Sequence, residues 1–151
     1  MGQAMTKMLL IAVLFLGGAT YAMMSMRARS MPENVSLAQL SGAELENDPD
    51  LLVVDIRTPD EWKQTGVVRD ALLVTYTGPE AFLEAVNARK LPQQKITLIC
   101  RSGNRSSKAA RQIAEMVEGD VIDVAGGMTR VLREGYRAVK PTREMGCVVC
   151  D

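Results

Sequence analysis

The chain has 151 residues, 47% of them hydrophobic and 24% charged, which is enough for one small domain with a single core beside an N-terminal apolar segment. Its 18 basic and 18 acidic residues give zero formal net charge, which argues against nucleic acid as a partner because such a surface needs a basic excess. Without histidine, Ser-His or Cys-His catalysis and histidine metal ligands are excluded, and 3 cysteines supply at most an incomplete zinc shell. We expect no metal and no cofactor, so any nucleophile must be activated by electrostatics.

Residues 1–26 predict a transmembrane anchor or a signal segment. No charged residue stands between Lys7 and Arg27, and as a helix this run would rise about 28 Å, close to a hydrocarbon core about 30 Å thick. The length favours a single-pass anchor. Small residues before a fair cleavage pair, Thr20 and Ala22, keep a cleaved secretory signal as the alternative.

The charges that flank this segment do not decide on which side of the membrane the domain lies. Lys7 and the amino terminus stand on one side and Arg27 and Arg29 on the other, so the positive-inside rule leans slightly toward a cytoplasmic domain. An apolar N-terminal segment followed by one translocated domain is nonetheless the common export pattern. We expect a single pass through a bacterial-type inner membrane with the domain in the periplasm, and the cytoplasmic side is the alternative.

After a polar linker at residues 27–34, strand-like and helix-like segments alternate through residues 35–141. Short apolar runs predict strands at Val35–Leu37, Leu51–Asp55, Ala71–Val74, Ile96–Ile99 and Val121–Val124. Caps and helix-opening residues predict helices that begin at Ser41 with Glu44, Thr58-Pro59 with Glu61, Gly78-Pro79, Ser106 or Ser107, and after Gly126-Gly127. This alternation predicts an α/β domain with a central parallel sheet covered by helices on both faces.

Cys100 directly follows the fourth expected strand and begins a loop that opens a helix. Loop N–H groups and the helix dipole favour negative charge there, and Arg101 and Arg105 add two positive charges close to the sulfur. Each effect favours thiolate over thiol, so we expect a nucleophile near neutral pH. The alternative, a small buried hydrophobe, fits poorly beside two arginines. Asp55, Arg57 and Cys100 all fall at carboxyl ends of strands, where sites in parallel sheets lie.

Four motifs in order resemble the rhodanese (sulfurtransferase) domain family over roughly residues 35–141. They are Val54–Arg57 with Pro59–Trp62, Gly66 with Ala71, Cys100–Ser106 and Val124–Met128. The resemblance implies an α/β fold with a central parallel sheet and a catalytic cysteine, here Cys100, that carries a persulfide sulfur from a small-molecule donor to a thiol or cyanide acceptor. The loop that would bind the sulfur substrate is Arg101, Ser102, Gly103, Asn104, Arg105 and Ser106.

The resemblance also implies supporting roles. Asp55 matches the strand-end acid of the family, and we expect it to accept backbone N–H bonds or to pair with an arginine such as Arg57. Arg101 and Arg105 are expected to guide an anionic donor such as thiosulfate. Two departures are that residues 66–71 lack the histidine common in the family, and that Val131 replaces a common tryptophan.

Two other functions compete with sulfur transfer. Phosphatases and some arsenate reductases of this fold have a Cys-x5-Arg loop, whereas Arg105 stands only five positions after Cys100, so this loop is one residue short. A shorter loop suits one sulfur atom better than a phosphoryl group. The other alternative is a non-catalytic module for binding or regulation, and such modules usually lack the cysteine.

Residues 142–151 form a tail in which Cys147 and Cys150 make a Cys-x-x-Cys pair. Such a pair can be a redox dithiol, half of a metal site or a local disulfide. A mobile tail could reach Cys100 and accept its sulfur or resolve it as a disulfide. An unstructured tail with incidental thiols is the alternative.

Overall fold

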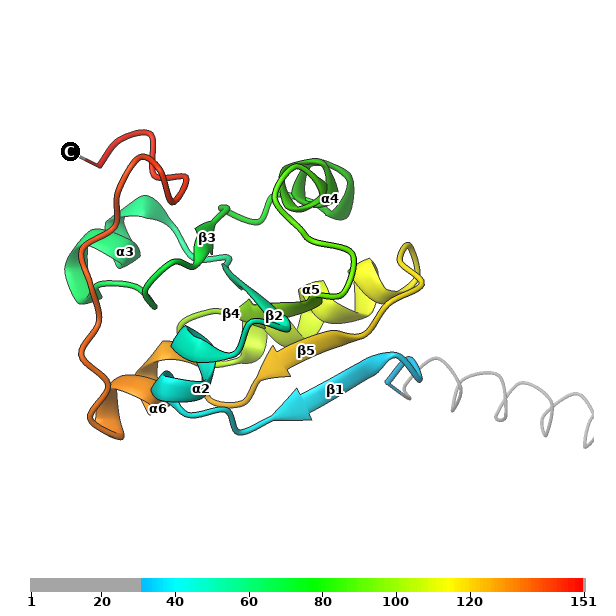
Figure 1. Cartoon of the computed structure of the whole chain (residues 1–151), viewed down its shortest axis with the longest axis horizontal. Coiled ribbons are helices and arrows are strands. Elements are labelled where there is room, and N and C mark those ends of the chain that lie inside the picture. Colours follow the sequence, from blue (N-terminus) through cyan, green and yellow to red (C-terminus); the bar gives the residue numbers. More distant parts are fainter. Residues whose placement is uncertain (1–30, 151) are drawn as a thin grey trace, which may run out of the picture. The chain divides into compact units, whose positions relative to one another are not determined.

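A parallel sheet forms the centre of the structure, a computed structural model that describes residues 31–150 (Figure 1). Its strands within that range are β1 (Val35–Ala38), β2 (Leu51–Asp55), β3 (Leu72–Leu73), β4 (Lys95–Ile99) and β5 (Val121–Val124). Their order across the sheet is β1-β5-β4-β2-β3, and each strand pairs with its neighbours in parallel. The predicted parallel sheet is confirmed, with β1 at one edge.

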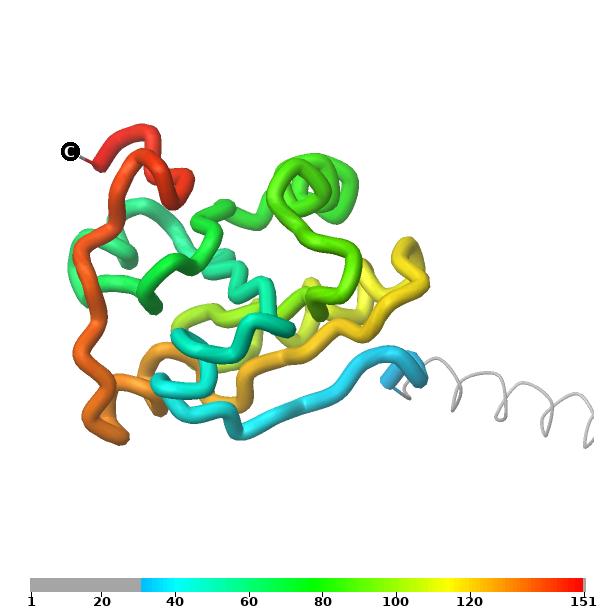
Figure 2. The backbone as a smooth tube through the Cα atoms, in the orientation of Figure 1, coloured from blue at the N-terminus to red at the C-terminus, as the bar shows by residue number. Residues whose placement is uncertain are grey.

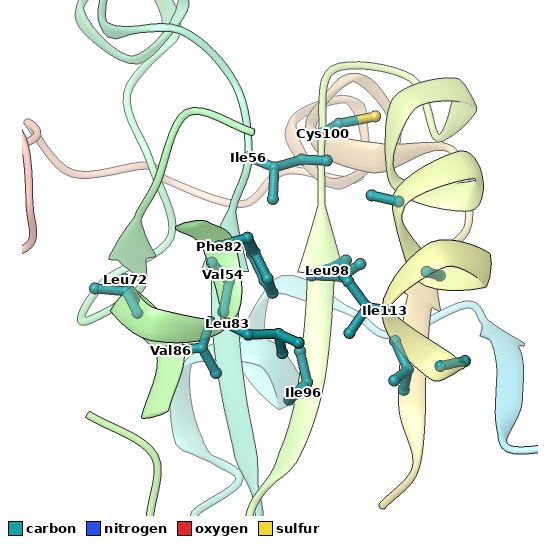
Figure 3. Close-up of a cluster of buried hydrophobic side chains, with 14 residues drawn as sticks. Val54, Ile56, Leu72, Phe82, Leu83, Val86, Ile96, Leu98, Cys100 and Ile113 are labelled. Atoms are coloured by element: carbon teal, nitrogen blue, oxygen red, sulfur yellow. The ribbon is translucent and has the colours of Figure 1, made fainter. Parts of the chain in front are cut away.

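Helices cover both faces of this sheet. Those in the described part of the chain are α2 (Gly42–Asn47), α3 (Pro59–Thr65), α4 (Pro79–Asn87), α5 (Asn104–Ala114) and α6 (Gly127–Arg133). One apolar cluster joins the sheet to α4 and α5, and a second joins its other face to α2, α3 and α6 (Figure 3 shows the first). The alternation along β4 follows this division: Ile96 and Leu98 belong to the first cluster and Ile99 to the second.

Local sequence signals explain where the helices begin. Both expected capping boxes are present, with the Ser41 hydroxyl accepting from the Glu44 N–H at 3.2 Å and the Thr58 hydroxyl accepting from the Glu61 N–H at 3.4 Å. The expected start of the helix after Cys100 is wrong, because α5 begins at Asn104 rather than at Ser106 or Ser107.

Gly103 is the reason for this earlier start. It is the N-cap of α5 with φ +94°, a left-handed conformation that glycine adopts without a Cβ penalty. The chain therefore turns from strand to helix within Arg101–Gly103, and Arg105 lies in the first helical turn rather than in a loop.

The C-terminal tail is folded against the β3 edge of the sheet. The Leu73 N–H donates to the Met145 carbonyl at 2.7 Å, and Cys147 and Cys150 form a disulfide whose two side chains are buried in the second cluster. Figure 2 shows the chain returning from α6 past α3 to this position. Of the open interpretations of the pair, the structure shows the local disulfide.

The expected membrane segment, residues 1–26, lies outside the described residues. Within residues 31–150, no helix is both long enough and apolar enough to cross a bilayer. The anchor or signal segment, the side of the membrane, and the boundaries at residues 27–34, 35–141 and 142–151 stay predictions.

Candidate active site

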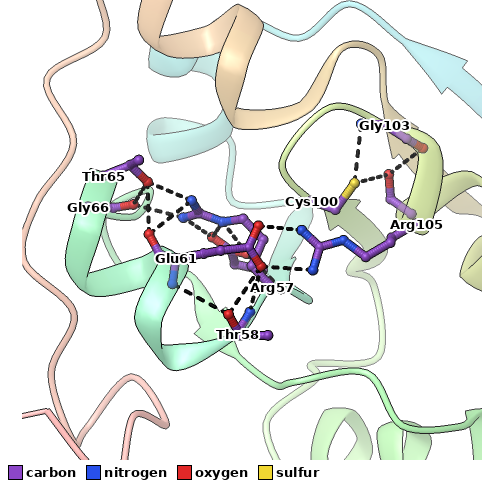
Figure 4. A network of polar contacts seen from close by, with 10 residues as sticks. Arg57, Thr58, Glu61, Thr65, Gly66, Cys100, Gly103 and Arg105 are labelled. Carbon is purple, nitrogen blue, oxygen red and sulfur yellow. Dashed lines mark hydrogen bonds and ion pairs between the residues drawn. The ribbon is translucent and has the colours of Figure 1, made fainter.

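Cys100 follows β4 directly and places its sulfur at the carboxyl end of the sheet. Its side chain is 1% exposed and belongs to the cluster beneath α4 and α5 (Figure 3). The sulfur is not purely in apolar packing, because it accepts the Gly103 N–H at 3.2 Å and the Ser106 hydroxyl at 3.4 Å (Figure 4). The structure therefore gives the sulfur two hydrogen-bond donors that would stabilise a negative charge.

The first turn of α5 leaves further donors unused. The Ser107 N–H donates to the Gly103 carbonyl at 3.0 Å, whereas the N–H groups of Asn104 and Arg105 have no backbone acceptor among residues 31–150. They are the ordinary orphan donors of a helix N-terminus, and the helix dipole adds to their partial positive charge.

The beginning of α6 holds the Cys100 segment from the other side. The Met128 N–H donates to the Cys100 carbonyl at 2.8 Å, and the Thr129 N–H donates to the Arg101 carbonyl at 2.9 Å. A Cβ on Gly127 would lie 2.3 Å from the Cys100 carbonyl oxygen, so only glycine permits this approach. Gly127 thus lets the start of α6 pack directly against the backbone of Cys100.

Asp55 and Arg57 form a buried ion pair at the end of β2. Their side chains are 0% and 1% exposed, and the Arg57 Nη2 lies 2.7 Å from the Asp55 Oδ2. The same guanidinium also donates through Nη1 to the Thr65 hydroxyl at 2.6 Å and through Nη2 to the Gly66 carbonyl at 2.8 Å. Arg57 therefore ties the end of β2 to the carboxyl end of α3.

Glu61 joins the site although sequence reasoning assigned it only a helix-capping role. Arg105 donates to its carboxylate through both Nη1, at 2.8 Å, and Nη2, at 2.5 Å (Figure 4). These bonds lower the pKa of Glu61 from 4.5 to about 2, and Glu61 in turn raises the pKa of Arg105, with a smaller contribution from nearby Cys100. No signal in the sequence links residues 61 and 105, which are 44 positions apart.

Replacing Glu61 with glutamine should make the stability of the domain less dependent on acid pH. Glutamine keeps the capping oxygen and removes the charge, so the expected loss at pH 7 is about 0.5–1 kcal/mol, a modest value because Arg105 is nearly half exposed and solvent screens the pair. The folded-state pKa lies below the unfolded one, so the difference is complete above pH 4.5 and shrinks as pH falls toward about 2. Urea denaturation of both proteins between pH 7 and pH 3 measures it, and a difference constant over that range would contradict the assignment.

Two cavities open beside this ion pair. One, of about 260 Å³, is lined by Arg57, Glu61, Gln64, Thr65, Arg101, Met128, Thr129 and Leu132. The other, of about 310 Å³, is lined by Ile56, Thr58, Thr75, Tyr76, Arg105, Lys108, Ala109 and Gln112. The exposed Arg101 has no ion-pair partner among residues 31–150, so its charge is available to the first cavity.

A family model for the rhodanese-like domain matches residues 39–138, which include Cys100, its hydrogen-bond partners, the two ion pairs of this site and the residues that line both cavities. The chain belongs to the rhodanese-like domain family. Among curated relatives, a sulfurtransferase from Allochromatium vinosum is 33% identical over 98 residues, which cover 64% of this chain and 86% of that protein.

A solved structure agrees with this assignment. A rhodanese-related protein from Thermoplasma volcanium superposes with a TM-score of 0.53 and 27% identity over 68% of this chain and 98% of that one. A protein of unknown function from Rhodopseudomonas palustris, described as a possible tyrosine phosphatase, gives a TM-score of 0.50 and 24% identity over 60% of this chain and 72% of that chain. At that identity the second likeness shows the shared fold alone.

Seven of the expected site residues fall into three separate groups. Cys100, Gly103 and Ser106 are in direct contact. Asp55 and Arg57 pair with each other. Cys147 and Cys150 pack on the opposite face of the sheet from the Cys100 cluster, so sulfur acceptance by the tail would require the disulfide to be reduced and to leave the core.

Proposed function

We propose that this rhodanese-like domain is a sulfurtransferase that moves a sulfane sulfur from a donor such as thiosulfate to a thiol or cyanide acceptor through a persulfide on Cys100. The observation that carries the proposal is the donation of the Gly103 N–H and the Ser106 hydroxyl to the Cys100 sulfur at the N-terminus of α5. Family membership and the sulfurtransferase relative support the same chemistry.

In the first half-reaction, the Cys100 thiolate attacks the outer sulfur of thiosulfate. A bond forms between the two sulfur atoms, the sulfur–sulfur bond of thiosulfate breaks, and sulfite leaves with the electron pair. In the second half-reaction, an acceptor thiolate or cyanide attacks the outer sulfur, and Cys100 departs as thiolate. Both halves place negative charge on sulfur, which the donors of the α5 N-terminus would stabilise without reorganisation.

The two arginines near Cys100 differ in how much positive charge they can offer to an anionic sulfur donor. Arg105 is bound to Glu61, which neutralises much of its charge, whereas Arg101 projects into the first cavity without an ion-pair partner in the described residues. We therefore assign the binding of the donor to Arg101, and we assign to Arg105 the coupling of α5 to α3.

Treatment with thiosulfate should add the mass of one sulfur atom to the wild-type protein, and Cys100→Ser should not gain it. Intact-protein mass spectrometry, followed by release of the added sulfur with cyanide, measures both half-reactions. Cys147→Ser with Cys150→Ser is the matched control, because it removes the other two sulfur atoms of cysteine while leaving Cys100 in place.

Three outcomes would contradict the proposal. If the wild type gains no sulfur, the domain is a non-catalytic module. If Cys100→Ser gains sulfur equally, the sulfur is carried elsewhere. If the protein hydrolyses an aryl phosphate and takes no sulfur from thiosulfate, the phosphatase alternative replaces sulfur transfer.

A further inference from the structure

The second of the two cavities, of about 310 Å³, has no part in the proposed binding of the sulfur donor. It opens between α5 and the segments that follow β2 and β3. The Glu61–Arg105 ion pair stands between the cavities, because Glu61 lines the first and Arg105 lines the second. The volume is at the lower end of the range for small-molecule sites, and cyanide would fill only a small part of it.

The inner wall of this second cavity is apolar and belongs to the cluster that contains Cys100. Ile56 and Ala109 are 2% and 1% exposed, and both are members of that cluster. The Tyr76 ring adds apolar surface and packs against Phe82 with the ring centroids 5.6 Å apart. Figure 3 shows the Cys100 sulfur directed toward α5, the helix that forms one wall of the cavity. The cavity therefore borders the surroundings of the nucleophile.

The rim of the second cavity is positively charged. Lys108 is exposed and has no ion-pair partner in the described part of the chain, whereas Glu61 offsets the charge of Arg105. No acidic residue is among those that line the cavity. The Tyr76 hydroxyl donates to the Gln112 Oε1 at 2.8 Å, which ties the segment after β3 to α5 and fixes the two walls relative to each other.

An apolar wall and one free cation suit a different ligand from thiosulfate. Thiosulfate is a small dianion without apolar surface, so it gains nothing from contact with Ile56 and Ala109. An organic anion gains from both features, because burial of its carbon chain is favourable and its carboxylate can pair with an ammonium group. Of the two reactants in the proposed sulfur transfer, the acceptor thiol is therefore the one that this cavity fits.

We propose that the second cavity binds the sulfur acceptor, and that this acceptor is a small organic thiol with an apolar body and a carboxylate. Its carbon chain packs on Ile56 and Ala109, and its carboxylate pairs with Lys108. The acceptor thiol loses its proton to solvent, and its sulfur attacks the outer sulfur of the Cys100 persulfide. A new sulfur–sulfur bond forms, the bond to Cys100 breaks with its electron pair left on Cys100, and an organic persulfide leaves. This inference rests on the proposed sulfur transfer and names its acceptor.

Three thiols that differ only in the group at the far end of the chain test the role of Lys108. Mercaptohexanoate, mercaptohexanol and aminohexanethiol carry a carboxylate, a hydroxyl and an ammonium group, respectively. The full chain is loaded with thiosulfate, and mass spectrometry at about 0.15 M salt gives the second-order rate constant for loss of the added sulfur to each thiol. We expect the order carboxylate, hydroxyl, ammonium. Lys108→Gln should lower the ratio of the first two constants about 2- to 5-fold, the range for an exposed ion pair, and Lys108→Glu should lower it further.

Arg111→Gln is the matched control for charge. Arg111 is an exposed cation on the next turn of α5 and does not line the cavity, so the ratio should stay unchanged. Thr75→Phe tests the space itself, because Thr75 is exposed and lines the cavity. A phenyl group there should slow discharge to mercaptohexanoate and mercaptohexanol more than discharge to cyanide, which needs little room.

Binding can also be measured without sulfur transfer. The full chain carrying Cys100→Ser is titrated with hexanoate, which has the same carbon chain as mercaptohexanoate and no thiol. Hexanoate should cause saturable changes in the backbone NMR signals of Tyr76, Lys108 and Ala109, and Lys108→Gln should weaken this binding about 2- to 5-fold. The signal of Thr129, which lines the first cavity, should change less.

The inference is overturned if hexanoate gives no saturable change or changes the signals of the first cavity alone. It is also overturned if Lys108→Gln and Arg111→Gln alter the ratio of rate constants equally. Sulfur uptake from thiosulfate by the wild type is scored separately. Saturable binding of hexanoate without sulfur uptake rejects the sulfurtransferase and leaves the second cavity as an organic-anion site. Normal uptake with no binding of hexanoate and equal rates for the three thiols rejects the acceptor site alone.

Discussion

Replacing Asp55 with alanine is expected to lower the free energy of unfolding by about 3–5 kcal/mol, a large fraction of the stability of a small domain. The cost comes from Arg57, whose side chain is 1% exposed and would be left buried without an opposite charge. Its Nε donates to both Asp55 oxygens, at 2.9 and 3.0 Å, and its Nη2 donates to one of them at 2.7 Å. Guanidinium does not lose its proton at working pH, so burial cannot be relieved by neutralisation.

Chemical denaturation in urea measures this loss, and an exposed ion pair in the adjacent helix provides the control. Asp60 and Lys63 lie 3.6 Å apart with side chains 96% and 48% exposed, so Asp60→Ala should cost less than about 1 kcal/mol. Equal effects of Asp55→Ala and Asp60→Ala would show that burial does not govern the pair. The double variant Asp55→Val with Arg57→Met should recover part of the loss, because it leaves no charge behind.

The Asp55–Arg57 pair also connects the fold to the chemistry. Arg57 holds the carboxyl end of α3, and α3 carries Glu61, which holds Arg105 in the first turn of α5. The same turn contains Ser106, whose hydroxyl donates to the Cys100 sulfur. Loss of the buried pair should therefore disturb the hydrogen bonds to the Cys100 sulfur even in molecules that remain folded.

Much of this architecture was predictable because its signals are local. The run Leu51–Asp55 is apolar and short, and it forms β2 with the same bounds. The capping box at Thr58 and Glu61 and the proline at position 59 place the start of α3. The composition of the segment after β4 predicts a nucleophile, because one cysteine, one glycine and two arginines lie within the six positions 100–105.

What could not be predicted depends on contacts between distant segments or on glycine conformation. Glu61 and Arg105 meet only because α3 and α5 both begin beyond the carboxyl ends of their strands, β2 and β4, which are neighbours in the sheet. Asp123 resembles any polar residue in a strand until its complete burial is known. The start of α5 was missed because serine is the commoner N-cap, whereas here the left-handed Gly103 takes that position.

Replacing Gly127 with alanine is expected to destabilise the domain by at least about 2 kcal/mol and to slow persulfide formation on Cys100 at least 10-fold. Two effects combine at this position. Gly127 has φ +55°, which costs an L residue about 1–2 kcal/mol, and its Cβ would meet the Cys100 carbonyl oxygen at 2.3 Å and the Arg101 carbonyl carbon at 2.9 Å. Both contacts are with backbone atoms, so relieving them requires moving the segment that carries Cys100.

Substitutions at two other glycines distinguish the effect of backbone strain from the effect of the close contact between α6 and Cys100. Gly135 has φ +96° but open space around its Cβ position, so Gly135→Ala should lose stability from backbone strain while keeping the wild-type rate of persulfide formation. Gly119 has neither a positive φ nor a neighbour within 4 Å, so Gly119→Ala should change neither property. The rate is measured by mass spectrometry after thiosulfate is added, under conditions in which each variant is folded. If Gly127→Ala lost no more activity than Gly135→Ala, the close approach of α6 would be dispensable, and the Cys100 backbone would have to be held by α5 alone.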